Sequence, residues 1–177
     1  DAPPGRPHLV ILHGLEGTTR SHYARGLFLE AVRRRWAADL LLFRGCGGEL
    51  NRARIFYHSG DTGDIDAVVR RLLAIDTNAP FLFVGVSLGG NVLLKWLGEC
   101  GESVDPRVIA AAAVSVPFDL ARASRHIDRG FSRVYQRHFL QSLRRKALAK
   151  LQQYPDLVSR ARVVSARTIY DFDDVVT

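Results

Sequence analysis

The pentapeptide Gly85-Val86-Ser87-Leu88-Gly89 is the part of the sequence whose residue types and spacing best fit a chemical reaction. It matches the pattern G-x-S-x-G, in which a serine on a tight strand-to-helix turn exposes its hydroxyl. An apolar run, residues 81–84, precedes the pattern, and a segment with helical character, residues 91–98, follows it. We therefore predict that Ser87 is a nucleophile for acyl transfer. The backbone N–H of Leu88, at the helix N-terminus, is expected to point at the developing oxyanion.

The tripeptide His13-Gly14-Leu15 follows the first apolar run, residues 8–12, and is the second candidate element of the site. In folds that carry such a serine turn, the loop after an earlier strand supplies another backbone N–H to the oxyanion. We therefore predict the N–H of Leu15 as the second oxyanion donor. His13 stands where a residue normally shapes this loop, so we interpret it as a site-shaping residue and not as the base. The same site-shaping role is assigned to Gly14, Gly85 and Gly89.

The order of apolar and amphipathic segments predicts the elements that position these residues. Four apolar runs have the length of strands, and all are continuous, which is typical of buried strands in a parallel sheet covered by helices on both faces. Amphipathic helices are expected between consecutive strands. The expected strands are residues 8–12, 39–43, 81–84 and 108–116, and the expected helices are residues 21–36, 61–73 and 91–98.

The composition changes after Pro117. Residues 120–160 are helical in pattern, rich in arginine and without a strand, which indicates a helical insertion or lid. Residues 162–164 could start a further strand, whereas residues 170–174 do not have a sheet sequence. We therefore predict one truncated α/β domain over residues 1–177, with a sheet core at 8–119 and a lid-like helical insertion at 120–170.

Seven short blocks carry more specific information than the serine motif alone. They are residues 13–17, 43–49, 57–62, 85–91, 115–120, 131–135 and 171–174. In content and order they resemble the YheT-like α/β-hydrolases, a family similar to bacterial predicted hydrolases, eukaryotic abhydrolase-domain lipases and the yeast ethyl ester synthase/esterases. The resemblance covers nearly the whole chain.

The resemblance implies an α/β-hydrolase fold and hydrolysis of carboxylic esters, lipid-derived acyl esters among them, through an acyl-enzyme on Ser87 and without a cofactor. It also implies that the acid and the histidine of the triad come after Asp174 and that leading strands come before His8. We therefore expect an incomplete domain that is inactive alone. The alternative is a fragment, or one piece of a split protein completed by a second chain, with a structural or binding role.

Residues inside the chain offer a weaker way to complete a triad. Asp119 directly follows the fourth apolar run, which is an alternative position for the acid. His126 and His138 are the histidines downstream of Ser87, but both stand in the arginine-rich helical region, where a solvated or packing histidine is the simpler interpretation. We therefore do not predict an internal triad.

Other residue types that could do chemistry point to no further site. Cys46 lies in a glycine-rich loop with no orienting base, so a packing thiol is the favoured interpretation. The acids Asp171, Asp173 and Asp174 lack spaced His or Cys partners, and we predict no metal site. The glycines of residues 45–48 lack the spacing of a phosphate-binding loop.

The composition is that of an ordinary soluble globular protein, with 47% hydrophobic and 24% charged residues and a formal net charge of +7. The basic residues are spread along the chain apart from two clusters, residues 33–35 and 144–146, so we expect no nucleic-acid partner. A small-molecule ester is the expected partner, and peripheral contact with lipid or membrane stays open. Two cysteines and the absence of an apolar run of about 18 residues favour the cytoplasm. The chain contains no methionine, so we expect further sequence upstream.

Overall fold

The computed structural model describes residues 5–127 and 132–176. The chain divides into two compact units. Unit 1 comprises residues 1–43 and 58–116, and unit 2 comprises residues 44–57 and 117–177. The loop of residues 44–57 therefore groups with the C-terminal helices, although it stands between two elements of unit 1 in the sequence.

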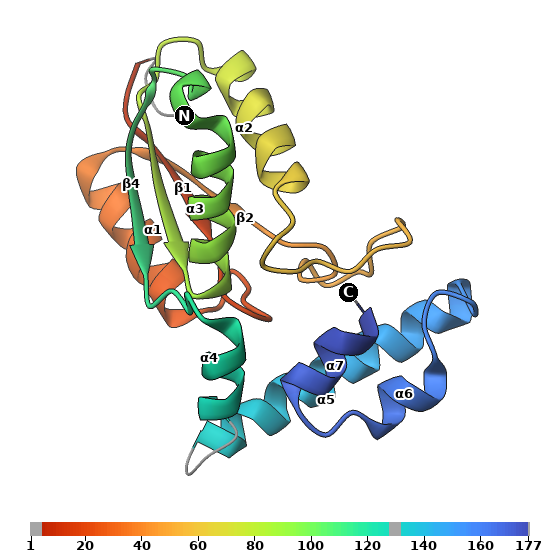
Figure 1. Ribbon diagram of the computed structural model, residues 1–177. Coiled ribbons are helices and arrows are strands. Elements are labelled where there is room, and N and C mark those ends of the chain that lie inside the picture. Colours follow the sequence, from red (N-terminus) through yellow and green to blue (C-terminus); the bar gives the residue numbers. More distant parts are fainter. Residues whose placement is uncertain (1–4, 128–131, 177) are drawn as a thin grey trace. The chain divides into compact units, whose positions relative to one another are not determined.

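Unit 1 is a parallel four-stranded sheet with helices between its strands (Figure 1). Its strand order is β2-β1-β3-β4, and every neighbouring pair is parallel. Its elements are β1 (His8–Leu12), α1 (His22–Arg34), β2 (Ala37–Leu41), α2 (Gly63–Ile75), β3 (Phe81–Val86), α3 (Leu88–Cys100), a 3₁₀ turn (Gly101–Ser103) and β4 (Val108–Val114). The predicted α/β architecture is confirmed.

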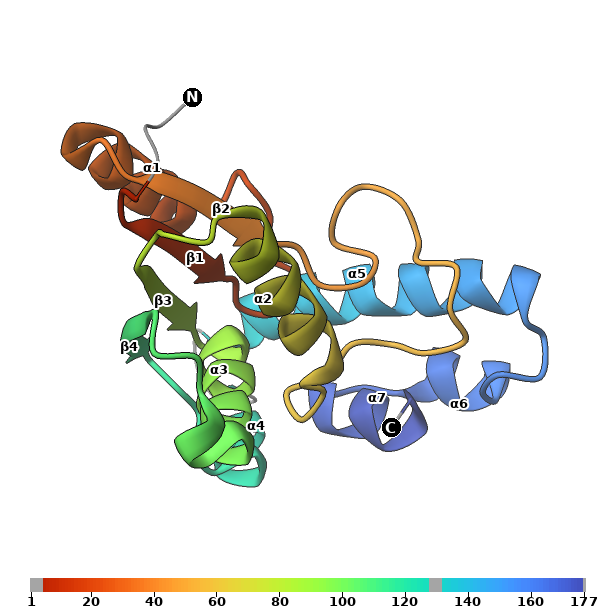
Figure 2. The same cartoon turned by 90° about the horizontal axis from the view of Figure 1, so that it is seen from above.

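The sheet of unit 1 is covered on both faces, because α1 lies on one side and α2 and α3 on the other (Figures 1 and 2). Leu9 and Ile11 of β1 face α1, where they form an apolar cluster with Ala31. On the opposite face Phe83 of β3 contacts Trp96 of α3, with ring centroids 5.7 Å apart. Side chains on both faces of the sheet thus pack against helices, which explains why the strand sequences are continuously apolar.

The second strand begins two residues earlier than the sequence predicts, at Ala37, and ends at Leu41 instead of residue 43. The cause is the sharp end of α1. Arg35 adopts a left-handed conformation with φ +58°, and the N–H of Trp36 bonds the carbonyl of Ala31. This closure ends the helix within two residues, so the chain enters the sheet at once.

The fourth strand differs from its prediction in burial. β4 was expected to be buried, yet Ile109 is 59% exposed and Val114 is 47% exposed. β4 is the last strand of the described sheet and pairs with β3 alone. Its apolar sequence is therefore that of a strand with one unpaired edge among the described residues.

Unit 2 consists of helices and the loop of residues 44–57. Its helices are α4 (Leu120–Ile127), α5 (Ser132–Gln153), α6 (Arg160–Ser165) and α7 (Ile169–Val176). Residues 162–164 lie inside α6, so the strand considered there is wrong. The hydroxyl of Ser159 accepts the N–H of Arg162 and caps this helix. Phe131, from one of the seven family-like blocks, lies outside the described residues. None of the helices in residues 5–127 and 132–176 has the length and apolar character needed to cross a membrane.

Candidate active site

Ser87 occupies a strained backbone position between β3 and α3. Its φ is +53° and its ψ is −119°, a conformation that non-glycine residues rarely adopt. The N–H of Ser87 donates to Val114 of β4 at 2.8 Å, and its carbonyl accepts the N–H of Gly90 at 2.9 Å. The sheet and the helix therefore hold both sides of the turn. These bonds also start α3 at Leu88, three residues earlier than the sequence predicts.

The glycines around Ser87 are required by close backbone approach. A Cβ atom on Gly85 would lie 2.5 Å from the carbonyl oxygen of Gly89, so the turn would not close. A Cβ atom on Gly89 would lie 2.5 Å from the carbonyl oxygens of both Leu12 and His13. The first glycine thus serves the turn itself, and the second lets α3 approach the end of β1.

The loop after β1 lies beside the serine. A Cβ atom on Gly14 would be 3.3 Å from the Cβ of Ser87 and 3.4 Å from the carbonyl oxygen of Val86. The N–H of Gly14 donates to the hydroxyl of Tyr23 at 2.9 Å, so α1 fixes this loop from its other side. The structure therefore brings together the two segments, 13–15 and 85–89, that the sequence singled out.

His13 is buried below this loop and is engaged through both ring nitrogens. Its Nδ1 is 2.6 Å from the carbonyl oxygen of Gly14, and its Nε2 is 3.1 Å from the backbone nitrogen of Phe43. An N–H can only donate and a carbonyl can only accept, so Nδ1 carries the proton and Nε2 accepts. A Cβ on Gly17 would lie 2.8 Å from the ring atoms Cγ and Nδ1 of His13. This environment suits a residue that holds a loop.

The backbone N–H groups of Leu15 and Leu88 remain the predicted oxyanion donors. Leu15 directly follows Gly14, and Leu88 is the first residue of α3, where N–H groups have no intrahelical acceptor. The first turn of α3 contains no acidic side chain that would oppose a negative charge. The positive end of the helix dipole is therefore available beside Ser87.

Two of the candidates outside this region, His8 and Asp119, have local structural partners. His8, the first residue of β1, lies at the sheet edge opposite Ser87 and contacts Asp39 at 2.7 Å. Asp119 accepts the N–H of Arg122 at 2.8 Å at the start of α4. His126 of α4 and His138 of α5 are both exposed.

The other sequence candidates also have structural contacts. Cys46 is buried, and the Nζ of Lys146 donates to its sulfur at 3.6 Å. Asp171 accepts the N–H groups of Arg167 and Thr168 at the start of α7. No group of three His, Cys, Asp or Glu residues suited to a metal occurs among residues 5–127 and 132–176.

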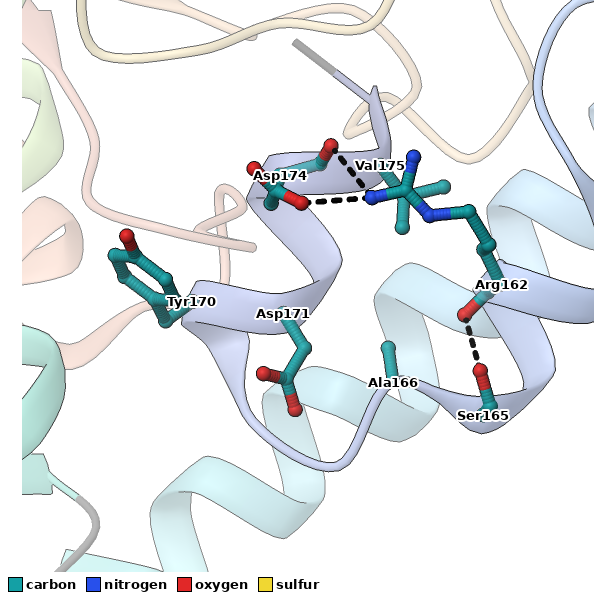
Figure 3. A pocket seen from close by; sticks show the side chains of 7 residues that line it. All are labelled: Arg162, Ser165, Ala166, Tyr170, Asp171, Asp174 and Val175. Carbon is teal, nitrogen blue, oxygen red and sulfur yellow. Dashed lines mark hydrogen bonds and ion pairs between the residues drawn. The ribbon is translucent and has the colours of Figure 1, made fainter.

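An open hollow of about 230 Å³ lies on unit 2 between α6 and α7 (Figure 3). Its charged groups are already paired, because Arg162 donates to the carboxylate of Asp174 at 2.7 Å. It is lined by Arg162, Ser165, Ala166, Tyr170, Asp171, Asp174 and Val175. Nothing in this lining resembles an activated nucleophile.

Two residues that support the candidate site were not predicted from the sequence. Tyr23 lies within the expected helix of residues 21–36, but its hydroxyl also binds the loop at Gly14. Phe43 was assigned to a strand, but its backbone N–H binds His13. A tyrosine on an otherwise aliphatic helix face was the available signal for the first. The second depends on where β2 ends, which no residue type indicates.

Comparison with known proteins places this geometry in a family. The model of the alpha/beta hydrolase fold family matches residues 7–166. The chain is 45% identical to an Escherichia coli (strain K12) protein named "Putative esterase YheT", with 97% of this chain and 51% of the relative covered. It is 32% identical to a Saccharomyces cerevisiae monoacylglycerol lipase, with 97% and 40% covered. It is 27% identical to Mus musculus phospholipase ABHD3, with 95% and 41% covered.

The chain thus spans about half, or somewhat less, of the length of these curated relatives. No solved structure gives a significant match. The resemblance to YheT-like proteins expected from the seven blocks is confirmed, as is the parallel α/β architecture. Because the family model matches most of the chain and the relatives are named as an esterase and a lipase, the chain belongs to the alpha/beta hydrolase fold family.

Proposed function

We propose that the protein is a serine hydrolase of carboxylic esters, with Ser87 as its nucleophile. The observation that carries this proposal is the backbone of Ser87, whose φ of +53° costs on the order of 1–3 kcal/mol and is held in place by bonds to β4 and α3. Strain of this kind at a serine is consistent with a hydroxyl that must be displayed for a reaction.

In the proposed reaction the hydroxyl oxygen of Ser87 attacks the ester carbonyl carbon. Its proton passes to a histidine base, and the N–H groups of Leu15 and Leu88 stabilise the oxyanion of the tetrahedral intermediate. When the intermediate collapses, the alcohol leaves with that proton and an acyl-serine remains. Water, deprotonated by the same histidine, then releases the acid and restores Ser87.

The base and its orienting acid are proposed to lie outside residues 1–177. His13 already uses both ring nitrogens, and His8 lies at the opposite edge of the sheet. The relatives named as esterase and lipases are about twice as long or more, which leaves room for both groups. Without the base, the chain alone should react several orders of magnitude more slowly than the intact protein.

Lipid-derived acyl esters are the proposed substrates. Two relatives carry the names monoacylglycerol lipase and phospholipase. Phe118, two residues before α4, is 82% exposed, and Leu120, the first residue of α4, is 49% exposed. Apolar side chains of this kind are suited to contact with an acyl chain or a lipid surface. We propose that the helices of residues 120–170 act as the lid of the substrate site and that the reaction needs no cofactor.

The alternative is an incomplete domain with a binding role, completed by a second chain. The exposure of Ile109 and Val114 on β4 favours it, since an unpaired strand edge can accept another strand. Under this alternative a separate polypeptide would supply the acid and the histidine. Copurification of such a chain would distinguish it from a single longer enzyme.

The proposal is tested by labelling the intact protein with a fluorophosphonate, which forms a bond from Ser87 Oγ to phosphorus as fluoride leaves. Ser115 supplies a matched control, because it has the same φ of +53° at the end of β4. We expect labelling of the parent and of Ser115→Ala, and none of Ser87→Ala. The 177-residue chain should label far more slowly. Fast labelling of that chain would place the base within it, and His126 and His138 would be replaced next. An unlabelled intact protein would refute ester hydrolysis and favour the binding role.

A further inference from the structure

The helix α1 packs on the sheet of unit 1 with one face and turns the other to solvent. Its inward face packs against β1 through Leu27, Phe28 and Ala31. Residues at i, i+4, i+7 and i+8 share one face of a helix, and four exposed residues of α1 have this spacing. We call this set the outward face of α1; it consists of Arg25, Leu29, Val32 and Arg33.

Two large apolar side chains are exposed on the outward face. Leu29 is 61% exposed and Val32 is 72% exposed. They stand three residues apart, so they are neighbours on the helix surface. The apolar cluster that joins α1 to β1 is made by other residues. A single exposed apolar side chain needs no explanation, but an adjacent pair between two arginines is suited to a partner that takes up apolar groups.

The segment that carries this face is strongly basic. Residues 20–35 hold five arginines and one acid, Glu30, which gives a net charge of +4 out of +7 for the whole chain. Glu30 contacts both Arg33 and Arg34, at 3.5 and 2.8 Å, so one carboxylate faces two cations. The five arginines are Arg20, Arg25, Arg33, Arg34 and Arg35.

The helix dipole does not account for all of this charge. Arg33 and Arg34 lie in the last turn of α1, where a cation is favourable. Arg25, however, is the fourth residue of the helix, and the first turn contains no acid that would offset it. A cation near a helix N-terminus lowers stability. An arginine at this point therefore indicates a role other than helix stability, as do the two apolar side chains beside it.

The opposite helical layer of unit 1 carries the opposite charge. Residues 61–105, which include α2 and α3, hold seven acids against three basic residues, a net charge of −4. α1 lies on one side of the sheet, and α2 and α3 lie on the other (Figures 1 and 2). Unit 1 thus has a basic layer and an acidic layer. Such a distribution orients a protein at a negatively charged surface with its basic side toward that surface.

We propose that the outward face of α1 docks on a membrane surface that contains anionic phospholipid. Arg25 and Arg33 pair with lipid headgroups, and Leu29 and Val32 enter the boundary between headgroups and acyl chains. A nucleic acid would use the arginines but not the apolar pair, and a neutral apolar partner would use the pair but not the arginines. The docking needs no chemistry at Ser87, so it goes beyond the proposed ester hydrolysis.

Cosedimentation of the intact protein with vesicles tests the proposal. Ser87→Ala is the parent for these measurements, so that hydrolysis through Ser87 cannot alter the lipids. We expect it to bind vesicles of phosphatidylcholine with about 30% phosphatidylserine at least about tenfold more tightly than vesicles of phosphatidylcholine alone. Raising the salt concentration from about 0.1 M to about 0.5 M should release it, because salt screens the attraction. Protein that stays in the supernatant with the anionic vesicles would overturn the proposal and leave a second copy or another protein as the occupant of this face.

Paired arginine substitutions on the two helical layers locate the docking surface. Replacing both Arg25 and Arg33 by glutamine should weaken binding about thirtyfold, since each arginine near anionic lipid contributes about 1 kcal/mol. The matched control replaces Arg70 and Arg71 of α2 by glutamine, which removes the same charge from the acidic layer. This control should bind within about twofold of the parent, because its arginines face away from the membrane. Equal weakening by the two pairs would show that net charge alone acts, and the docking of α1 would be wrong.

The apolar pair is tested in the same assay. Replacing both Leu29 and Val32 by serine should weaken binding to anionic vesicles about tenfold or more, because two apolar side chains lose their burial in lipid. The control is Ile75→Ser at the end of α2, where the side chain is 65% exposed, and it should bind as the parent does. The melting temperature of each variant shows whether it is folded. A folded serine pair that bound as tightly as the parent would refute the insertion of α1 into the membrane surface.

Discussion

Replacing Gly89 by alanine tests whether the serine turn depends on contact between α3 and the end of β1. The added Cβ would lie 2.5 Å from two backbone carbonyl oxygens, those of Leu12 and His13. That is roughly 0.8 Å short of the ~3.3 Å at which carbon and carbonyl oxygen ordinarily meet. Neither oxygen can turn aside by a side-chain rotation, so the helix must move away from the strand.

The magnitude follows from two opposing effects. Overpacking of this kind costs about 1–3 kcal/mol or more, and alanine returns at most about 1 kcal/mol of helix propensity. We therefore expect Gly89→Ala to lower the free energy of unfolding by about 1–2 kcal/mol, or the melting temperature by about 2–8 °C. Gly98 is the matched control, because it lies in the same helix, is exposed and has nothing within 4 Å of an added Cβ. Gly98→Ala should raise stability by about 0.5–1 kcal/mol.

The assay is thermal and urea unfolding of both variants, followed by fluorophosphonate labelling. The shift of α3 should also move Ser87 away from Gly14, so labelling of Gly89→Ala should slow while that of Gly98→Ala stays at the parent rate. If Gly89→Ala melted at or above the parent temperature while Gly98→Ala behaved as expected, the contact would not exist as described. The loop after β1 would then not lie against α3 as described.

Three further substitutions test the site and the sheet. Ser87→Gly should be about 1 kcal/mol more stable than Ser87→Ala in urea unfolding, since glycine relieves the strain at φ +53°; equal stabilities would contradict the strain. His13→Phe should lose about 1–3 kcal/mol, because the N–H of Phe43 loses its acceptor, and an unchanged urea midpoint would count against that bond. The hydrogen bond from His8 lowers the pKa of Asp39. The stabilisation of the folded state by this bond is therefore present above about pH 4 and is lost as the pH falls through the folded-state pKa of Asp39. The free energy of unfolding of Asp39→Asn should therefore change less between pH 5 and pH 3 than that of the parent. The difference should be under about 1 kcal/mol, because the side chain of Asp39 is 56% exposed.

The strands of the sheet could be predicted because burial on two faces leaves a strong signal in the sequence. Residues 9–12 and 81–84 are continuously apolar, and both faces of the sheet pack against helices, with Leu9 and Ile11 toward α1 and Phe83 toward α3. The end of α1 was misplaced because its closure depends on the left-handed conformation of Arg35, a residue type that rarely adopts it. Helix ends of this kind have no signal without the usual glycine.

The burial of β4 and the grouping of residues 44–57 could not be predicted for a different reason. An apolar run indicates that a strand is suited to burial, but it does not indicate which residues cover it. The loop of residues 44–57 is polar and rich in glycine, which is typical of a solvated connection. Its attachment depends on Lys150 and Asn51, which lie 99 residues apart in the sequence. A polar contact over that separation has no periodic signature.

The serine motif carries information about a segment outside its five residues, because one of its glycines is required by close contact with the end of β1. Gly85 is needed by the turn itself, since its Cβ would meet Gly89. Gly89 is needed by the end of β1, since its Cβ would meet Leu12 and His13. The second glycine of the pattern therefore indicates that the end of β1 lies close to the serine turn. A serine turn with only its first glycine could form between β3 and α3, but it would hold the helix off the loop at Gly14 and leave Ser87 without the N–H proposed for its oxyanion.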